Sequence, residues 1–568
     1  MKKSCILLAA VMAASLCAPV ASAASVLPAS AAEEDPPVVG FWSTEPGVTE
    51  RPVSEGSDET YAEEDRMWQG LPTIAITPGG RIWCAWQTGD SIEGSQGIDN
   101  YDVMYYSDDD GKTWSSKYMI WDVPDDDIRL TSPCLFYDQF GKLWLVLIRG
   151  GLNGVYALEM KNPDCEDPAN NLEMGEPISW LKFPPSHRVT ILSNGYWITP
   201  VEVNTQRQET YICRPDNEAG KYAWIPNTSQ PAVTAYPDNK TFGESQIIEL
   251  QDGSLMMLSR LPKDCGGGME ISYSYDFGNS WTPYKADNGV PYISPSSKFF
   301  IQRLESGAIL LVTHATTSDR KQLAAYLSYD DGKTWPYMLM LDDSEIRNNW
   351  RDFGVSYPEV SAQQGEHGEI YIAYDAGRYE LKEIRMCVIT EEDIKAGKPV
   401  TEYCRMREQI SRLGGYMNYV DTKEDYERYY TVEPGTEKSA IVEQLPTTVT
   451  LVGEDGSELE LTGEWECLDY SKNVEGRYTF SFSKQVTSGK VQDLYSLLKV
   501  YVTVASPEEP DQPDQPGDDP GDQPSDDPNE GGGCGASVAG FGAGGAAVLL
   551  AGTATALLLK KKTSAKRK

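Results

Sequence analysis

Ionisable side chains recur at equivalent points along the middle of this chain of 568 residues. Many are arginines, whose planar guanidinium offers paired donors to a carboxylate and stays charged at any relevant pH. The others are chiefly carboxylates and a tyrosine, groups that can transfer protons or attack carbon. The set comprises Arg66, Asp90, Glu93, Arg149, Glu202, Glu244, Arg260, His314, Tyr357 and Arg378. It is richer in charge than a scaffold needs, and it predicts a polar binding or catalytic site.

A six-fold repeat provides the elements that would position these residues. A turn glycine followed by a hydrophobic strand occurs six times, about 54 to 61 residues apart. Short apolar runs precede several of these glycines, so each unit reads as strand, tight turn, strand and a further pair of strands. The glycines are Gly80, Gly141, Gly195, Gly253, Gly307 and Gly368. Six such units predict an all-β fold with a six-bladed β-propeller.

The propeller places the ionisable residues on one rim. In a blade, the first strand starts at the face where the second strand ends. The ionisable residues stand just before the first apolar run of a unit, or about seven to ten residues after its turn glycine. We therefore expect them to share one rim, and we expect the turn glycines on the other.

A second motif, Ser-x-Asp-x-Gly-x-Thr/Ser-Trp, overlays the repeat at residues 107–114, 274–281 and 328–335. Its Asp can accept backbone N–H groups across a hairpin, its Gly suits a positive φ, and its Trp can pack between blades. The motif is therefore structural. With the six-fold repeat, it resembles the Asp-box propellers of the sialidase (neuraminidase) superfamily, over roughly residues 61–399.

The resemblance implies an exo-α-sialidase that retains anomeric configuration, with an arginine triad, a Tyr nucleophile, a Glu partner and an acidic acid/base. Glu244 starts one strand and Arg260 ends the next, as in the family's fourth blade. Arg320 resembles the third arginine of the triad, and Tyr357 in Val-Ser-Tyr-Pro-Glu resembles the nucleophile. A neutral Tyr deprotonated by Glu244 avoids the repulsion that a carboxylate nucleophile would meet from the sialic acid carboxylate.

Two parts of the implied site stay open. Where the family has Phe/Tyr-Arg-Ile-Pro, this chain has Gln-Gly-Leu-Pro at residues 69–72, so the first arginine is missing from its place. The nearest substitute is Arg66, and the further candidates are Arg129, Arg188 and Arg378. The acid/base is Glu93 or Asp90, with Asp99 as another candidate. The alternatives are a related exo-glycosidase acting on another anionic sugar, or a catalytically inactive glycan-binding adhesin.

Composition and missing motifs exclude other classes of function. The formal net charge of −37, with no basic stretch in the body of the chain, makes nucleic acid an unexpected partner. His187, His314 and His367 are too few and too scattered for a metal site, and no P-loop occurs. The cysteines of the middle of the chain show neither metal-ligand spacing nor a disulfide framework. We expect an enzyme without metal or cofactor.

The two ends predict export and anchoring. Residues 1–31 have the basic start, apolar run and small-residue sites of a signal peptide. Residues 534–559 are uncharged and long enough to span a bilayer, and a basic tail follows at 560–568, which predicts a C-terminal transmembrane helix. The chain would be held at a bacterial cell surface, with sialylated glycans or glycoproteins as partners. Between the ends we expect an extension over 32–60, the propeller over 61–402, a connector over 403–440, an Ig-like domain over 441–506 and a Pro/Asp-rich disordered linker over 507–533.

Overall fold

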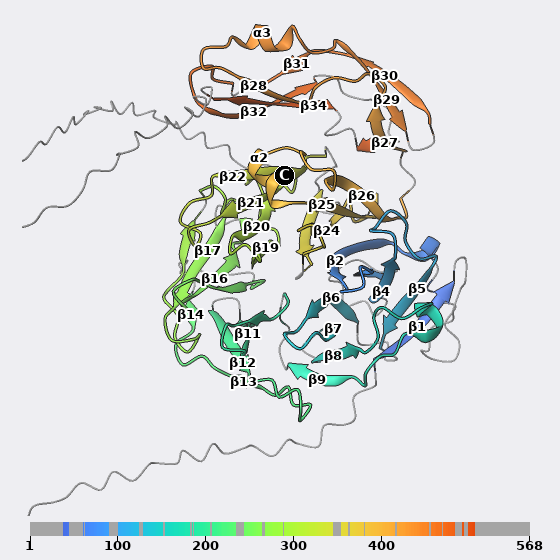
Figure 1. Cartoon of the computed structure of the whole chain (residues 1–568), viewed down its shortest axis with the longest axis vertical. Helices are drawn as coiled ribbons and strands as arrows, with labels where there is room; N and C mark the ends of the chain where they lie inside the picture. Colours follow the sequence, from blue (N-terminus) through green and yellow to red (C-terminus); the bar gives the residue numbers. More distant parts are fainter. Residues whose placement is uncertain are drawn as a thin grey trace, which may run out of the picture. The chain divides into compact units, whose positions relative to one another are not determined.

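The computed structural model describes residues 38–44, 61, 63–89, 100–123, 129–150, 154–181, 185, 187–204, 207–233, 243–263, 267–287, 289–344, 354–361, 364–379, 381–414, 417–453, 456–467, 470–482, 491–493 and 498–505. In these residues the fold is almost entirely β, and six antiparallel sheets follow one another around a common centre (Figure 1). The all-β, propeller-like fold predicted from the sequence is confirmed. The predicted signal peptide, linker, transmembrane helix and tail lie outside the described residues. No helix of the described part is long and apolar enough to cross a membrane.

In each sheet of the ring, the strands follow chain order from the innermost strand outward. The exceptions are β1, described next, and β14, which pairs with β12. In the first sheet an additional strand, β1, pairs with the outer strand β5. The first three sheets consist of β1 (Val39–Thr44), β2 (Trp68–Ile76), β3 (Ile82–Gly89), β4 (Asn100–Ser107) and β5 (Lys117–Asp122); β6 (Leu130–Tyr137), β7 (Leu143–Arg149), β8 (Val155–Met160) and β9 (Ile178–Leu181); and β10 (Thr190–Ile191), β11 (Trp197–Asn204), β12 (Arg207–Cys213), β13 (Trp224–Pro226) and β14 (Ala232–Val233).

The other three sheets of the ring have four strands each. They consist of β15 (Gln246–Glu249), β16 (Leu255–Arg260), β17 (Met269–Ser274) and β18 (Lys285–Asp287); β19 (Phe300–Arg303), β20 (Ile309–His314), β21 (Leu323–Ser328) and β22 (Tyr337–Asp342); and β23 (Val355–Val360), β24 (Ile370–Ala376), β25 (Glu383–Ile389) and β26 (Arg405–Arg412). Short helices lie in the connections: η1 (Glu63–Asp65), α1 (Pro168–Asn171) and α2 (Glu391–Ala396).

Hydrophobic cores lie between neighbouring sheets and hold the ring together. Six buried clusters each combine residues of two adjacent sheets. The ring closes where Trp86 and Tyr101 of the first sheet pack with Tyr371 and Ile384 of the sixth. Since every blade buries both faces against its neighbours, loss of one blade would expose the apolar faces of two others.

The six predicted turn glycines join the first two ring strands of each sheet. All six have a φ between 78° and 89°, the left-handed region that favours glycine. At Gly80, Gly141, Gly253 and Gly307 an added Cβ would meet nothing within 4 Å, so the backbone conformation rather than lack of space requires glycine. These turns are the sequence signal that defined the repeat.

The three Asp boxes form nearly identical turns. In the first, Asp109 Oδ1 accepts the Thr113 backbone N–H at 2.8 Å and Oδ2 accepts the Thr113 hydroxyl at 2.6 Å. Asp276 and Asp330 make the same contacts with the residue four positions later. The Trp of the second box, Trp281, is buried in the core between the third and fourth sheets. The boxes therefore act as structural staples at the rim that also carries the turn glycines.

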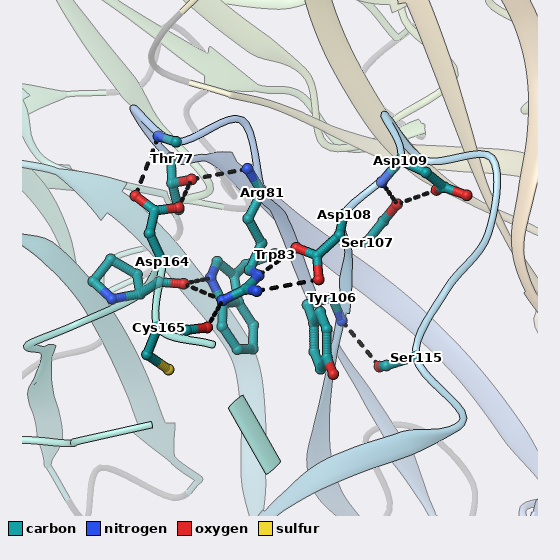
Figure 2. A network of polar contacts seen from close by, with 12 residues as sticks. Thr77, Arg81, Trp83, Tyr106, Ser107, Asp108, Asp109, Ser115, Asp164 and Cys165 are labelled. Atoms are coloured by element: carbon teal, nitrogen blue, oxygen red, sulfur yellow. Dashed lines mark hydrogen bonds and ion pairs between the residues drawn. The ribbon is translucent and has the colours of Figure 1, made fainter. Parts of the chain in front are cut away.

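A polar network ties the first and second sheets together at this rim (Figure 2). Arg81 lies at its centre, with Nε and Nη2 donating to the two oxygens of Asp108 at 2.6 and 3.1 Å. Its Nη1 donates to the carbonyls of Pro163 and Cys165 at 3.0 and 2.7 Å. The Thr77 hydroxyl donates a hydrogen bond to the Asp164 carboxylate in the same network. Because all three guanidinium nitrogens of Arg81 are hydrogen-bonded across two blades, this arginine belongs to the scaffold.

Three innermost strands are interrupted where a residue precedes proline. Leu71-Pro72 in β2, Ser132-Pro133 in β6 and Tyr357-Pro358 in β23 each fall at a shift of strand register. The residues before the prolines have φ of 57°, 47° and 55°. A residue before proline normally adopts an extended conformation, so these are strained bulges of the kind found next to active sites.

After the ring, residues 417–505 form two four-stranded sheets around a shared core. They contain β27 (Met417–Thr422), β29 (Thr448–Gly453), β30 (Glu458–Thr462) and β33 (Val491–Asp493) in one sheet, and β28 (Tyr429–Val432), β31 (Trp465–Glu466), β32 (Gly476–Phe482) and β34 (Lys499–Val504) in the other, with helix α3 (Lys438–Val442) between strands. The structure differs from the predicted connector over 403–440, because β26 completes the sixth blade and β27 and β28 belong to the C-terminal sheets. An Ig-like topology for these sheets stays a prediction.

Candidate active site

Tyr357, Glu244 and Arg260 meet at the rim where the innermost strands begin. The Tyr357 hydroxyl donates to Glu244 Oε1 at 3.2 Å and accepts from Arg260 Nη1 at 3.1 Å. The same Arg260 nitrogen donates to Glu244 Oε2 at 2.6 Å, so the three side chains form a closed triangle. Tyr357 is 7% exposed, whereas 21% of the Glu244 side chain is accessible. The phenol is therefore held between a proton acceptor and a fixed cation.

Antiparallel pairing brings Glu244 and Arg260 together. Gln246 at the start of β15 pairs with Leu258 near the end of β16, so the residues just beyond this pair share one end of the hairpin. Glu244 has a φ of 36° and follows Gly243 with a φ of 73°. With Tyr357 on its own bulge, two of the three residues have strained backbones, which is typical of positions selected for function rather than stability.

Two more arginines flank the Tyr357 ring. Arg320 Cζ lies 5.3 Å and Arg378 Cζ lies 4.2 Å from the ring centroid. Arg320 Nη2 donates to the Ser296 carbonyl at 3.1 Å. Arg378 Nε and Nη2 each donate to one oxygen of Asp375 at 3.0 Å. Three guanidinium groups thus surround one phenol.

The charges shift each other's pKa values. Burial alone would raise the pKa of Glu244, but the charge and hydrogen bond of Arg260 outweigh burial and hold it below its usual value. Burial lowers the pKa of Arg320, and the charges of Arg260 and Arg378 lower it further. Among the described residues, Arg260 forms an ion pair with Glu244 and Arg378 forms one with Asp375.

The structure places other predicted residues elsewhere. Among the described residues, Arg66, expected as the substitute for the first arginine, does not contact Tyr357, Glu244 or Arg260. Although it precedes β2, its side chain turns outward, 4.6 Å from the Tyr118 ring and 3.6 Å from Glu63, with Tyr105 as its hydrogen-bond acceptor. Arg149 bonds to Tyr156. Asp90, Glu93 and Asp99 lie outside the described residues.

A buried charge cluster beneath Tyr357 was not foreseen from the sequence. Glu359, two residues after Tyr357, accepts from Arg188 Nη2 at 2.8 Å and from Lys298 Nζ at 3.2 Å. His187 Nδ1 lies 3.7 Å from the same carboxylate, and burial with the charge of Lys298 lowers the pKa of His187 to about 4. The available signal was a lone Glu in the otherwise apolar and small strand Val-Ser-Tyr-Pro-Glu-Val.

We expect Glu359→Gln to reduce the free energy of unfolding by about 3 kcal/mol, because it leaves two buried cations without their carboxylate. Burial opposes ionisation, but Lys298 and Arg188 hold the pKa of Glu359 well below its usual value. Its stabilisation is therefore present above the unfolded pKa, about 4.3, and is lost as pH falls through the folded pKa. Urea unfolding should show a constant deficit from pH 8 to 5. Glu369→Gln, in the same blade, is the matched control, and an equal loss there would contradict this assignment.

Comparisons with known proteins identify a family whose model matches the ring of sheets. Residues 80–372 match the family model described as BNR repeat-like domain. No curated protein sequence matches the chain. Among solved structures, a Hadza microbial sialidase, Hz136, is 17% identical, with 59% of this chain and 68% of that chain covered and a TM-score of 0.43. The intramolecular trans-sialidase from Ruminococcus gnavus is 13% identical (58% and 95% covered, TM-score 0.40). The NanB sialidase from Streptococcus pneumoniae is 14% identical (58% and 67% covered, TM-score 0.38). Because the family match spans more than half of the 568 residues, the chain belongs to the BNR repeat-like domain family.

Proposed function

We propose that the protein is an exo-α-sialidase that removes terminal sialic acids from glycoconjugates with retention of configuration. The observation that carries the proposal is the position of the Tyr357 hydroxyl, hydrogen-bonded to Glu244 at 3.2 Å and to Arg260 at 3.1 Å. A phenol between a carboxylate and a guanidinium can lose its proton to one and be stabilised as an anion by the other.

In the first step, Tyr357 Oη attacks the anomeric carbon while its proton passes to Glu244. The bond to the leaving oxygen breaks, and that oxygen takes a proton from an acid that we propose to be Glu93 or Asp90. In the second step, water attacks the anomeric carbon of the tyrosyl intermediate and gives a proton to the acid/base, and Tyr357 leaves as a phenol by recovering the proton from Glu244. Two inversions at the same carbon give retention.

The charge of the site supports an anionic sugar. Arg260 and Arg320 present guanidinium groups beside Tyr357. A substrate carboxylate on the anomeric carbon would be bound by the paired donors of such guanidinium groups. A neutral phenol can approach such a carbon, whereas a carboxylate nucleophile would be repelled. We further propose that the enzyme acts outside the cell, as its predicted signal peptide implies.

The experiment compares hydrolysis of three glycosides that share one fluorogenic aglycone: an α-sialoside, a β-glucuronide and a neutral β-galactoside. We expect release from the sialoside alone, with the α-anomer of free sialic acid as the first product in a proton NMR time course. Cleavage of the glucuronide alone would replace the proposal with an exo-glycosidase for another anionic sugar. If no glycoside is cleaved but a glycan array shows binding, the protein is a glycan-binding adhesin.

A further inference from the structure

Gly70 in β2 lies against Arg378 of the sixth blade. A Cβ at Gly70 would lie 3.0 Å from Arg378 Nε, 3.1 Å from its Cδ and 3.2 Å from Asp375 Oδ2. The φ of Gly70 is not in the left-handed region, so its backbone conformation would accept another residue. What restricts a side chain here is the space that Arg378 and Asp375 occupy, because both would have to move to make room for one.

Asp375 fixes Arg378 in that space and joins the first blade to the sixth. Its Oδ2 accepts the Leu71 N–H at 3.1 Å, and its Oδ1 accepts the Ser356 hydroxyl at 2.7 Å. Both oxygens also accept from Arg378 at 3.0 Å. Asp375 and Arg378 are 0% and 1% exposed. Leu71 is the strained residue before Pro72, and Ser356 precedes Tyr357, the strained residue before Pro358. Asp375 therefore contacts both bulges.

We infer that Arg378 fills, from the sixth blade, the space that an arginine side chain at position 70 would fill from the first blade, and that Gly70 is the residue that admits it. The cation reaches the Tyr357 ring from the end of β24 instead of from β2. The inference rests on the proposed function, in which Tyr357 is the nucleophile. A guanidinium stacked 4.2 Å from the ring centroid favours the anionic form of the phenol as its proton leaves.

Arg378 acts here as a positioning residue rather than as a substrate ligand. Two of its nitrogens are engaged by Asp375, and the side chain is almost completely buried. Its effect should therefore appear in the chemical step and not in substrate binding. This separates it from Arg260 and Arg320, whose loss should raise KM for an anionic sugar.

The first arm of the test is kinetic and uses Arg378→Ala, Gly70→Arg and the double variant. We expect Arg378→Ala to lower kcat about 30-fold with KM changed less than threefold, which corresponds to about 2 kcal/mol in the barrier. The double variant should recover at least tenfold of that loss, because an arginine from β2 can enter the vacated space. Arg303→Ala, at the opposite rim, should leave kcat unchanged. An unchanged kcat in Arg378→Ala, or a folded double variant no faster than Arg378→Ala, would overturn the inference.

The second arm does not need activity. Gly70→Arg alone should lower the melting temperature strongly because its side chain overlaps Arg378, and adding Arg378→Ala should restore part of the loss. If the effects of the two substitutions on the melting temperature are additive, the two arginine side chains do not compete for one space, and the inference is overturned. If the wild-type chain cleaves no sialoside, the proposed function and the kinetic role of Arg378 fall together, while the melting temperatures still decide whether the two side chains compete for one space.

Discussion

Replacing Tyr357 with Phe should lower kcat for sialoside hydrolysis by about 10³-fold or more, equivalent to roughly 4 kcal/mol of barrier. The substitution removes one oxygen, which is the atom proposed to form the glycosyl bond. It also removes the acceptor of the Arg260 hydrogen bond and the donor to Glu244. The ring and its flanking arginines remain, so the fold and KM should change little. Initial rates with a fluorogenic α-sialoside measure the effect.

Tyr374→Phe is the matched control for this variant. Tyr374 is another buried tyrosine of the sixth blade, and its hydroxyl donates to the Asp342 carboxylate at 2.9 Å. Removing that hydroxyl should lower stability by about 1 kcal/mol and leave kcat unchanged. Equal activity in wild type and Tyr357→Phe would exclude Tyr357 as the nucleophile, even if the sialidase activity itself stands.

Replacing Glu244 with Gln should lower kcat/KM by about 10² to 10⁴-fold, the range that a positioned general base contributes. The amide cannot take the Tyr357 proton, and Arg260 loses a charged partner at 2.6 Å. In the wild type, burial opposes ionisation, but Arg260 keeps the pKa of Glu244 below its usual value. The carboxylate therefore stays ionised as pH falls to the ordinary value of about 4.3, and activity decreases only below it. Glu244→Gln should lose this acid limb, and pH profiles of kcat/KM measure the difference.

Glu249→Gln provides the matched control at the other end of β15. The Glu249 carboxylate accepts the Ser193 N–H and hydroxyl at 2.6 and 2.7 Å, at the opposite end of the strand from the site. This variant should keep both the wild-type rate and the acid limb. An acid limb that persists in Glu244→Gln would show that another carboxylate controls it.

Local rules predicted the parts of the fold that depend on short-range geometry. A glycine between two apolar runs needs only a positive φ to form a turn, and all six predicted turns have one. The Asp-box contacts join residues four positions apart, so the residues of the motif alone determine the turn. Glu244 and Arg260 were predicted together because the two strands of a hairpin bring their outer ends to one rim.

Contacts between blades could not be predicted in this way. Arg66 precedes an innermost strand, but the packing of Tyr105 and Tyr118 turns it outward. The position of Arg378 depends on the meeting of the first and sixth blades, about 300 residues apart in sequence. Glu359 is ionised in a buried strand only because Arg188 and Lys298 arrive from other blades. Sequence periodicity can place residues of different repeats on one rim, but it does not show which of their side chains touch.

Covalent trapping tests the central claim most directly. A sialyl donor with a fluorine beside the anomeric carbon reacts slowly, because the fluorine destabilises the positive charge of the transition states before and after the intermediate. After incubation with this donor and proteolysis, mass spectrometry should find the fluorosialyl group on the peptide that contains Tyr357, and no label in Tyr357→Phe. A label on a carboxylate, or steady turnover with inverted product and no label, would contradict the account.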